Sequence, residues 1–195
     1  MEKSRIVVEE MMLNVEQEKK LPEDMIKKCA GVAIFPSMVK GGFFVGGAYG
    51  KGVVLKYKNG VWTGPAFITI GAGSFGLQFG AQSVDLILVI LGEKTMDAFM
   101  RSKFKLGADV AVAAGPVGAQ ATAATEILLR GGIYSYSRTK GAFIGISLEG
   151  AGIGSNTGLN QAYYGNTGNT QVILAGTVKP PESGQKLIAA LNKLK

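Results

Sequence analysis

The first thirty residues of the chain alternate apolar and polar positions with a helical period. The apolar stripe of the first predicted helix consists of Val8, Met11, Met12 and Val15. Its i, i+3, i+4, i+7 spacing, with glutamates on the other side, predicts an amphipathic helix over residues 4–18. Pro22, followed by two acidic residues, predicts the start of a second helix that ends at Gly31, because proline needs no N–H donor there and acids suit the positive end of the helix dipole.

From Val32 onward the period changes from helical to two, which is typical of β-strands. Alternation over residues 53–57 runs into Asn59-Gly60, which is the strongest short-range signal for a β-hairpin. Pro65 is expected to end that pairing, because proline cannot donate to a strand ladder. Further strands are expected over residues 67–70, 77–82, 84–91 and 171–177, with a second hairpin over 133–149 and a pair of small-residue strands within 107–125.

Helical spacing returns in the middle of the chain, over residues 93–102, and again at its C-terminus. The C-terminal apolar stripe consists of Leu187, Ile188, Leu191 and Leu194. It follows a Pro-Pro stop and predicts a closing amphipathic helix over residues 182–195. Residues 150–169 are rich in Gly, Asn, Thr and Ser, which indicates a loop with one turn of helix at residues 159–164.

The chain contains 29 glycines, and many of them interrupt the strand-like segments. Glycine inside a strand marks a bulge, a bend or a close backbone approach. The predicted fold class is therefore α+β, with a strongly curved, mostly antiparallel, barrel-like sheet of glycine-rich strands, two N-terminal helices, a mid-chain helix and a C-terminal amphipathic helix. We expect one domain over residues 1–195, with a helical arm over 1–30, a β body over 31–178 and the closing helix over 182–195.

The composition speaks against most catalytic chemistry. The chain has no histidine and one cysteine, which excludes Ser-His-Asp and Cys-His nucleophile systems and a zinc site built from histidine and cysteine. The acidic residues of the β body stand singly, so their spacing offers no acid-base pair. We therefore expect no enzyme, with no catalytic residue, no metal and no cofactor, and interpret Cys29 as a small buried apolar residue.

Two short motifs favour structure over chemistry. Residues 71–76 match the G-x-G-x-x-G fingerprint of nucleotide sites, but the alternation that follows is that of a strand and not of the helix that such a site requires. Residues 37–40 match the S-x-x-K of serine acyl-enzymes, but two glycines follow at once and the companion motifs are missing from the sequence.

The net charge of the chain is +7, and its basic residues dominate the region between residues 25 and 84. That region holds six lysines and no acidic residue; the lysines are Lys27, Lys28, Lys40, Lys51, Lys56 and Lys58. Such a run favours an anionic partner, and several of these lysines on one face would bind an anionic membrane surface in a salt-sensitive way. A solvated face that only keeps the protein in solution is the alternative interpretation.

The two terminal amphipathic helices differ as candidates for membrane insertion. The first carries glutamates that an anionic surface would repel, whereas the C-terminal helix carries Lys186 and Lys193 beside its apolar stripe, which makes these two lysines a secondary candidate lipid site. The alternative is that both stripes pack on the sheet. Nucleic acid is a weaker hypothesis as the partner, because the strand aromatics serve a sheet core equally well.

Six segments resemble the SYLF domain family and follow its order. They are AGVAIFP (30–36), GFFVGGAYGKGVV (42–54), WTGPAFI (62–68), GAGSFGLQFGAQSVD (71–85), AAGPVG (113–118) and GAFIGISLEG (141–150). The resemblance covers about residues 22–195. It implies a non-enzymatic module at the membrane periphery that binds anionic phospholipid, with phosphoinositide-like headgroups favoured, in a family whose eukaryotic members are associated through further segments with cortical actin.

An alternative within the same resemblance is a structural or protein-interaction module that docks a partner or self-associates, with no specific lipid ligand. The chain shows no signal-peptide pattern and no apolar run of the length that a membrane-spanning helix needs. The expected location is therefore in solution or at the periphery of a membrane, with export as the alternative if the chain is a processed form.

Overall fold

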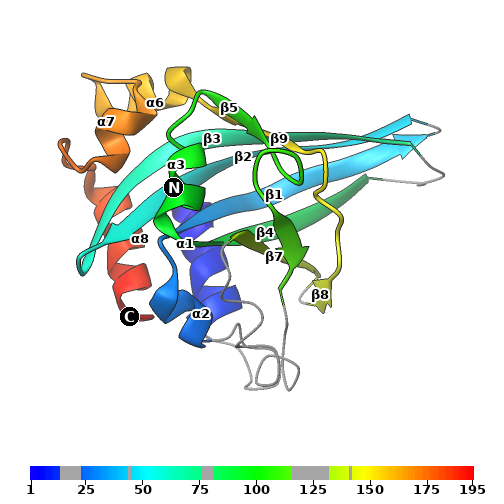
Figure 1. Ribbon diagram of the computed structural model, residues 1–195, viewed down its shortest axis with the longest axis horizontal. Coiled ribbons are helices and arrows are strands. Elements are labelled where there is room, and N and C mark those ends of the chain that lie inside the picture. The colour runs from blue at the N-terminus through cyan, green and yellow to red at the C-terminus, as the bar shows by residue number, and fades with distance from the viewer. Residues whose placement is uncertain (14–22, 44, 76–80, 116–131, 141) are drawn as a thin grey trace.

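The computed structural model describes residues 1–13, 23–43, 45–75, 81–115, 132–140 and 142–195 (Figure 1). The strands are β1 (Gly31–Phe43), β2 (Val45–Lys58), β3 (Val61–Phe75), β4 (Ala81–Leu91), β5 (Lys103–Lys105), β6 (Val112–Ala114), β7 (Gly132–Thr139), β8 (Ala142–Ile144) and β9 (Gly152–Ser155). The helices are α1 (Glu2–Val8), the π-helix η1 (Glu9–Leu13), α2 (Glu23–Lys28), α3 (Glu93–Ala98), α6 (Thr157–Tyr164), α7 (Thr170–Leu174) and α8 (Glu182–Asn192). These elements confirm the α+β fold class.

The described strands form one nine-stranded sheet in the order β5-β9-β3-β2-β1-β4-β7-β6, with β8 paired to β7. Neighbours are antiparallel except for β6 and β7, which run parallel. Asn59-Gly60 turns β2 into β3, and both residues have positive φ angles, as the hairpin signal requires. The β1, β2 and β3 strands project well beyond the helices (Figure 1).

The sheet has two faces, which we name by the cores that they carry. The inner face carries Phe35, Leu86, Ile133, Phe104 and Ile153. These residues come from both ends of the strand order and share one apolar cluster, so the sheet curls strongly around it, as the glycine-rich strands predicted. The outer face carries the residues that alternate with them, such as Ile34, Val53 and Ile87.

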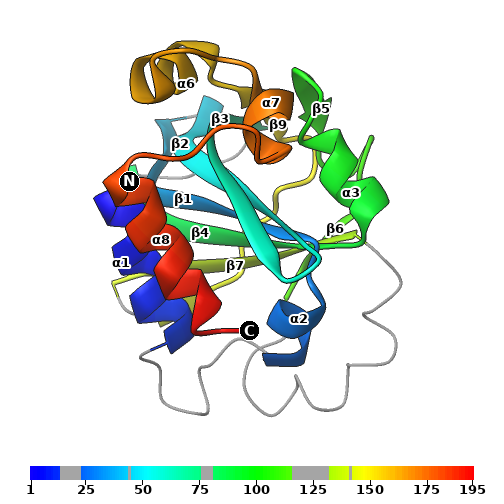
Figure 2. The ribbon, with the colours of Figure 1, turned by 90° about the vertical axis from the view of Figure 1, so that its left-hand side faces the viewer.

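Helices cover one end of the outer face. The apolar residues of α1, η1, α2 and α8 that pack there are Val7, Val8, Met11, Met12, Met25, Ile26, Leu187 and Leu191. The α1 and α8 helices lie side by side on the sheet (Figure 2). The described residues of both amphipathic stripes therefore pack on the sheet, which was the alternative to membrane insertion; Val15 lies outside the described residues. The predicted helix over residues 4–18 is present as far as the structure describes it, as α1 to Val8 and then as the π-helix η1 to Leu13; residues 14–18 lie outside the described residues.

The C-terminal Lys195 fastens the end of the chain to this covered region. Its ammonium donates to the carbonyl oxygens of Lys27 at 2.9 Å and Cys29 at 3.4 Å, and lies 3.8 Å from the centre of the Tyr57 ring and 5.6 Å from that of Trp62. Partial burial lowers the pKa of the Lys195 ammonium, and burial raises the pKa of the Cys29 thiol. Cys29 is buried, as the sequence predicted.

The last predicted strand is wrong, because residues 170–174 form the helix α7. The β-branched residues of this segment indicated a strand, but the Asn169 side chain accepts the Gln171 N–H at 2.8 Å and caps a helix. Ile173 and Leu174 are buried against the inner core, which selects the helical spacing over the strand propensity.

Three further expectations need correction. Pro65 does not end the hairpin: pairing shifts register between Val54 and Lys56 and then continues along β3 to Phe75. Residues 150–169 contain the strand β9, and α6 begins at Thr157, earlier than the predicted turn of helix. Within 107–125, only β6 is described, and its partner is β7; the remainder of that predicted pair and residues 77–80 of another predicted strand lie outside the described residues.

A buried amide, that of Asn160, attaches α6 to the edge of β3. Its oxygen accepts the Phe67 N–H at 2.6 Å, and its NH2 group donates to the Phe67 carbonyl at 3.3 Å and to the Gly168 carbonyl at 3.4 Å. Asn160 is fully buried. Together with the Asn156 N–H, which donates to the Phe67 carbonyl at 2.9 Å, the side chain thus bonds the edge of β3 at Phe67, where β9 has already ended.

Candidate functional site

The strand register places two rows of residues across neighbouring strands of the sheet. The first row runs Lys51, Thr69, Gly154, Lys103 over β2, β3, β9 and β5. The second row runs Val39, Tyr49, Gly71, Gly152, Lys105 and begins one strand earlier, on β1. We call these nine residues the outer patch.

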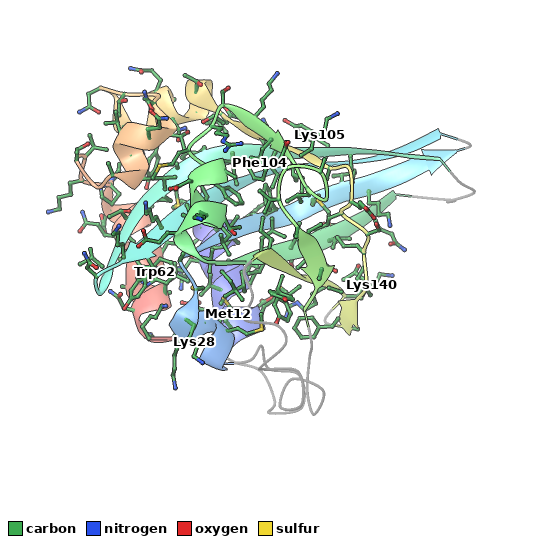
Figure 3. The ribbon with its side chains drawn as sticks, in the orientation of Figure 1. Met12, Lys28, Trp62, Phe104, Lys105 and Lys140 are labelled. Atoms are coloured by element: carbon green, nitrogen blue, oxygen red, sulfur yellow. The ribbon has the colours of Figure 1, made fainter. Side chains whose placement is uncertain are left out.

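The outer patch lies on the outer face, because its sequence neighbours point inward. A Cβ on Gly50 would lie 2.9 Å from Met38, and one on Gly52 would lie 2.5 Å from the Phe35 ring, so Lys51 between them points outward. On β5, the buried Phe104 belongs to the inner core, which turns Lys103 and Lys105 to the other side. Figure 3 shows Phe104 and Lys105 on neighbouring positions of this strand.

No helix covers this part of the outer face among the described residues. Val39 is 55% exposed and Tyr49 is 54% exposed, and they are direct cross-strand neighbours. The three lysines of the patch are exposed as well. The patch therefore combines an apolar pair with basic side chains on an open sheet surface.

The surface is hollowed on the Lys103 and Lys105 side of the patch. A hollow of about 540 Å³ lies over β9 and β5, lined by Thr69, Gly152, Gly154, Lys103, Lys105 and Asp109, with Phe104 and Ile153. Lys51 and Lys103 stand three strands apart in one row, which is about 14 Å at the usual strand spacing. The positions between them carry only Thr69 and glycine, so the lysines form two walls around a low floor.

The lysines of the patch lack the acidic partners that some basic groups of the protein have. Arg5 pairs with Glu2 and Glu9, and Arg138 pairs with Glu10. In the part of the chain that the structure describes, Lys51, Lys103 and Lys105 form no ion pair. Asp109 also lines the hollow, and its carboxylate accepts the backbone N–H of Lys105 at 2.7 Å.

The six lysines predicted as one site do not share a face. Lys51 belongs to the outer patch, whereas Lys56 and Lys40 alternate with it and lie on the inner side of the sheet. Lys58 pairs with Glu93 at 3.0 Å beside α3. Lys27 and Lys28 lie on α2, and Lys28 and Lys105 are on opposite sides of the molecule in Figure 3.

The secondary candidate site lies on α8, where Lys186 pairs with Glu182 at 2.8 Å. That contact raises the pKa of Lys186 and lowers the pKa of Glu182. Lys193 follows the last turn of the helix. The apolar residues beside these lysines face the sheet, with Leu187 and Leu191 fully buried, so α8 has no free apolar stripe for membrane insertion.

The two motifs weighed in the sequence have strand geometry. Residues 71–75 continue β3, and Ser37 and Lys40 lie on β1, where the Ser37 N–H donates to Asp85 at 2.8 Å. Over the described residues, no group of three His, Cys, Asp or Glu side chains is placed to hold a metal ion. The described helices are also too short or too polar to cross a membrane.

The sequence predicted Lys51 as a site residue but did not predict Lys103 and Lys105. Lys103 and Lys105 lie about fifty positions after Lys51 and meet it only through β9, which the sequence did not predict. The alternation of Lys103 and Lys105 around Phe104 was the available signal for a short half-buried strand.

Comparison with known proteins gives a consistent group of relatives. Residues 71–194 match the family model Ysc84, described as "Las17-binding protein actin regulator". LAS seventeen-binding protein 3 of Saccharomyces cerevisiae is 31% identical over 176 residues, which is 88% of this chain and 38% of the yeast protein. SH3 domain-containing YSC84-like protein 1 of Xenopus laevis is 31% identical over 90% of this chain and 53% of its own length. The chain thus spans about half or less of these relatives.

Proposed function

Because this chain belongs to the Ysc84 family, described by its binding to Las17 and its regulation of actin, we propose that it is a non-enzymatic protein-binding module of the actin-regulating kind. The names of the relatives support a protein partner, since the yeast protein is called a LAS seventeen-binding protein. The binding surface that we propose is the outer patch.

The observation that carries this proposal is the exposed apolar pair Val39 and Tyr49. Each residue follows or precedes a buried position of its strand, Met38 next to Val39 and Gly50 next to Tyr49, and the described helices α1, η1, α2 and α8 cover the opposite end of this face. Tyrosine on an open surface supplies a large contact area with little loss of side-chain freedom, which makes it common in the centres of protein interfaces.

Co-sedimentation with filamentous actin tests the proposal. We expect the protein to pellet with filaments, and the double variant Val39→Ser, Tyr49→Ala to pellet several times less. Val61→Ser is the matched control, because Val61 is also an exposed apolar strand residue, at 58%, but lies on β3 outside the outer patch. Equal pelleting of the double variant and the control would remove the patch from the proposal, and no pelleting of the unaltered protein would remove its actin part.

A second candidate function is the binding of anionic phospholipid, which the positive charge of the chain favours. The face that would meet the headgroups can be identified, because Lys51 and Lys56 lie on opposite sides of the sheet. We expect Lys51→Glu to reduce sedimentation with phosphatidylserine vesicles at low salt more than Lys56→Glu does. Equal sedimentation with phosphatidylserine and phosphatidylcholine vesicles would exclude this function.

A further inference from the structure

We propose that the outer patch binds an acidic, extended polypeptide segment, which lies over the glycine floor between Lys51 on one side and Lys103 and Lys105 on the other. The proposal rests on the protein-binding function above, and it adds the chemistry of the partner. It is carried by the three exposed lysines on one face, the hollow beside Lys103 and Lys105, and the glycine positions between these two lysines and Lys51.

Protection of the sheet edge explains only two of the three lysines of the outer patch. Lysines on an edge strand commonly prevent pairing with other chains, and this accounts for Lys103 and Lys105 on the terminal strand β5. It does not account for Lys51, because β2 is an inner strand with a partner on each side. Asp109 also blocks the free edge at Lys105, with its backbone N–H and carboxylate both bonded there.

The floor of the patch lacks side chains that the protein itself would accommodate. A Cβ on Gly71 would meet no atom within 4 Å, and Gly71 is not among the glycines with positive φ. Glycine weakens a strand interior, so a position that neither packing nor backbone conformation requires is consistent with close approach by another backbone. Gly152 and Gly154 continue this low surface to β5.

The shape and charge of the patch favour a polypeptide strand over other occupants. A floor two strands wide between lysine walls admits an extended chain with acidic side chains on both flanks. The exposed Tyr49 and Val39, at the Lys51 side, provide a contact for an apolar residue of the same segment. A second copy of this chain would bring three lysines against three lysines, and a flat membrane would contact the walls without reaching the floor.

Fluorescence anisotropy with a labelled peptide of ten glutamates and one central phenylalanine tests the proposal. We expect salt-sensitive binding that weakens about two- to fivefold for each of Lys51→Glu, Lys103→Glu and Lys105→Glu, the range of exposed ion pairs. Gly71→Val should weaken binding about tenfold or more by filling the floor, without lowering the urea midpoint of unfolding. Lys28→Glu and Gly145→Val are the matched controls, because both positions are exposed and lie outside the outer patch.

Each result has a definite meaning. Undiminished peptide binding by Gly71→Val, or equal losses in Lys28→Glu and Lys51→Glu, would overturn the proposal. Absence of peptide binding would also overturn the proposal. So would vesicles of phosphatidylserine that bind through Lys51 without displacing the peptide, because the peptide would then not occupy the Lys51 site. If the peptide does not bind but sedimentation with actin still depends on Tyr49, the acidic-segment proposal is wrong and the protein-binding function stands. If the protein does not sediment with actin but binds the peptide, the actin part of the proposed function is wrong and the acidic-segment proposal stands.

Discussion

The two ends of the outer face belong to the same strands but have opposite characters. At one end, Ile34, Val53 and Leu55 are fully buried beneath α1 and α8. At the other end, Val39, Tyr49 and Lys51 lie on the same strands and the same face and are exposed among the described residues. A bulge in β1 between these ends shifts the register and marks the boundary.

One end of the outer face therefore contributes mainly to the stability of the fold, and the other end is available for binding. Apolar burial at the covered end stabilises the fold, and the bare end is held in place by the continuous ladders of β1, β2 and β3 and by its inner-face residues. The residues of the outer patch can therefore contact a partner, because few contacts within the protein depend on them.

Truncating one residue at each end of the outer face should give the largest difference in the free energy of unfolding. We expect Leu55→Ala to lower the free energy of unfolding by about 2–5 kcal/mol, because Leu55 is fully buried in the outer core. Tyr49→Ala should change it by no more than about 0.5 kcal/mol. Urea denaturation followed by circular dichroism measures both, and similar losses for the two variants would contradict the division.

A pair of glycines on neighbouring strands sharpens the same comparison. Gly52→Ala should cost about 1–3 kcal/mol, because its Cβ would collide with the Ile34 carbonyl and the Phe35 ring. Gly71→Ala should be neutral or gain up to about 1 kcal/mol, because its Cβ meets nothing and alanine restricts the unfolded chain. The urea midpoints of the two variants should therefore move in opposite directions or differ clearly, and a loss at Gly71 would show that the floor has a structural role.

Lys195→Met tests how the covered end is closed. The variant loses the contacts of the ammonium with the Lys27 and Cys29 carbonyls and with the Tyr57 ring, and we expect a loss of about 1 kcal/mol. Amide hydrogen exchange should quicken in α2 and in the last turn of α8 while the projecting strands keep their protection. Faster exchange in the projecting strands would mean that the two ends are coupled.

Thiol reactivity gives the smallest and most local readout. Burial raises the pKa of the Cys29 thiol, so the native state holds less thiolate than the unfolded state at pH 8. We expect native Cys29 to react with a disulfide reagent more slowly than in urea, because the native state holds less thiolate and buries the sulfur. A Tyr49→Cys thiol in a Cys29→Ser background should react at once, and slow reaction there would indicate cover over the bare end.

The covered end was also the more predictable of the two from sequence. The Asn59-Gly60 turn and the stripe of Leu187 and Leu191 are local signals, and both elements are present. The outer patch depends on register between distant strands, above all on β9, whose Gly-Ile-Gly-Ser sequence has too few apolar residues for a periodic signal. Lys51 was recognised through its charge, but only the register shows that Lys103 and Lys105, and not Lys56, share its face.

The placement of Trp62 gives the protein an optical reporter. Trp62 is the only tryptophan of the chain; it is 4% exposed, packs 4.9 Å from the Tyr57 ring and lies beneath the Lys195 ammonium, and its indole N–H has no hydrogen-bond partner among the described residues. Its emission should therefore be blue-shifted in the native protein and move to the red when the C-terminus detaches. A ligand on the outer patch should leave this emission unchanged. Trp62 fluorescence can therefore report whether the C-terminus stays attached at the covered end while a ligand is titrated onto the outer patch.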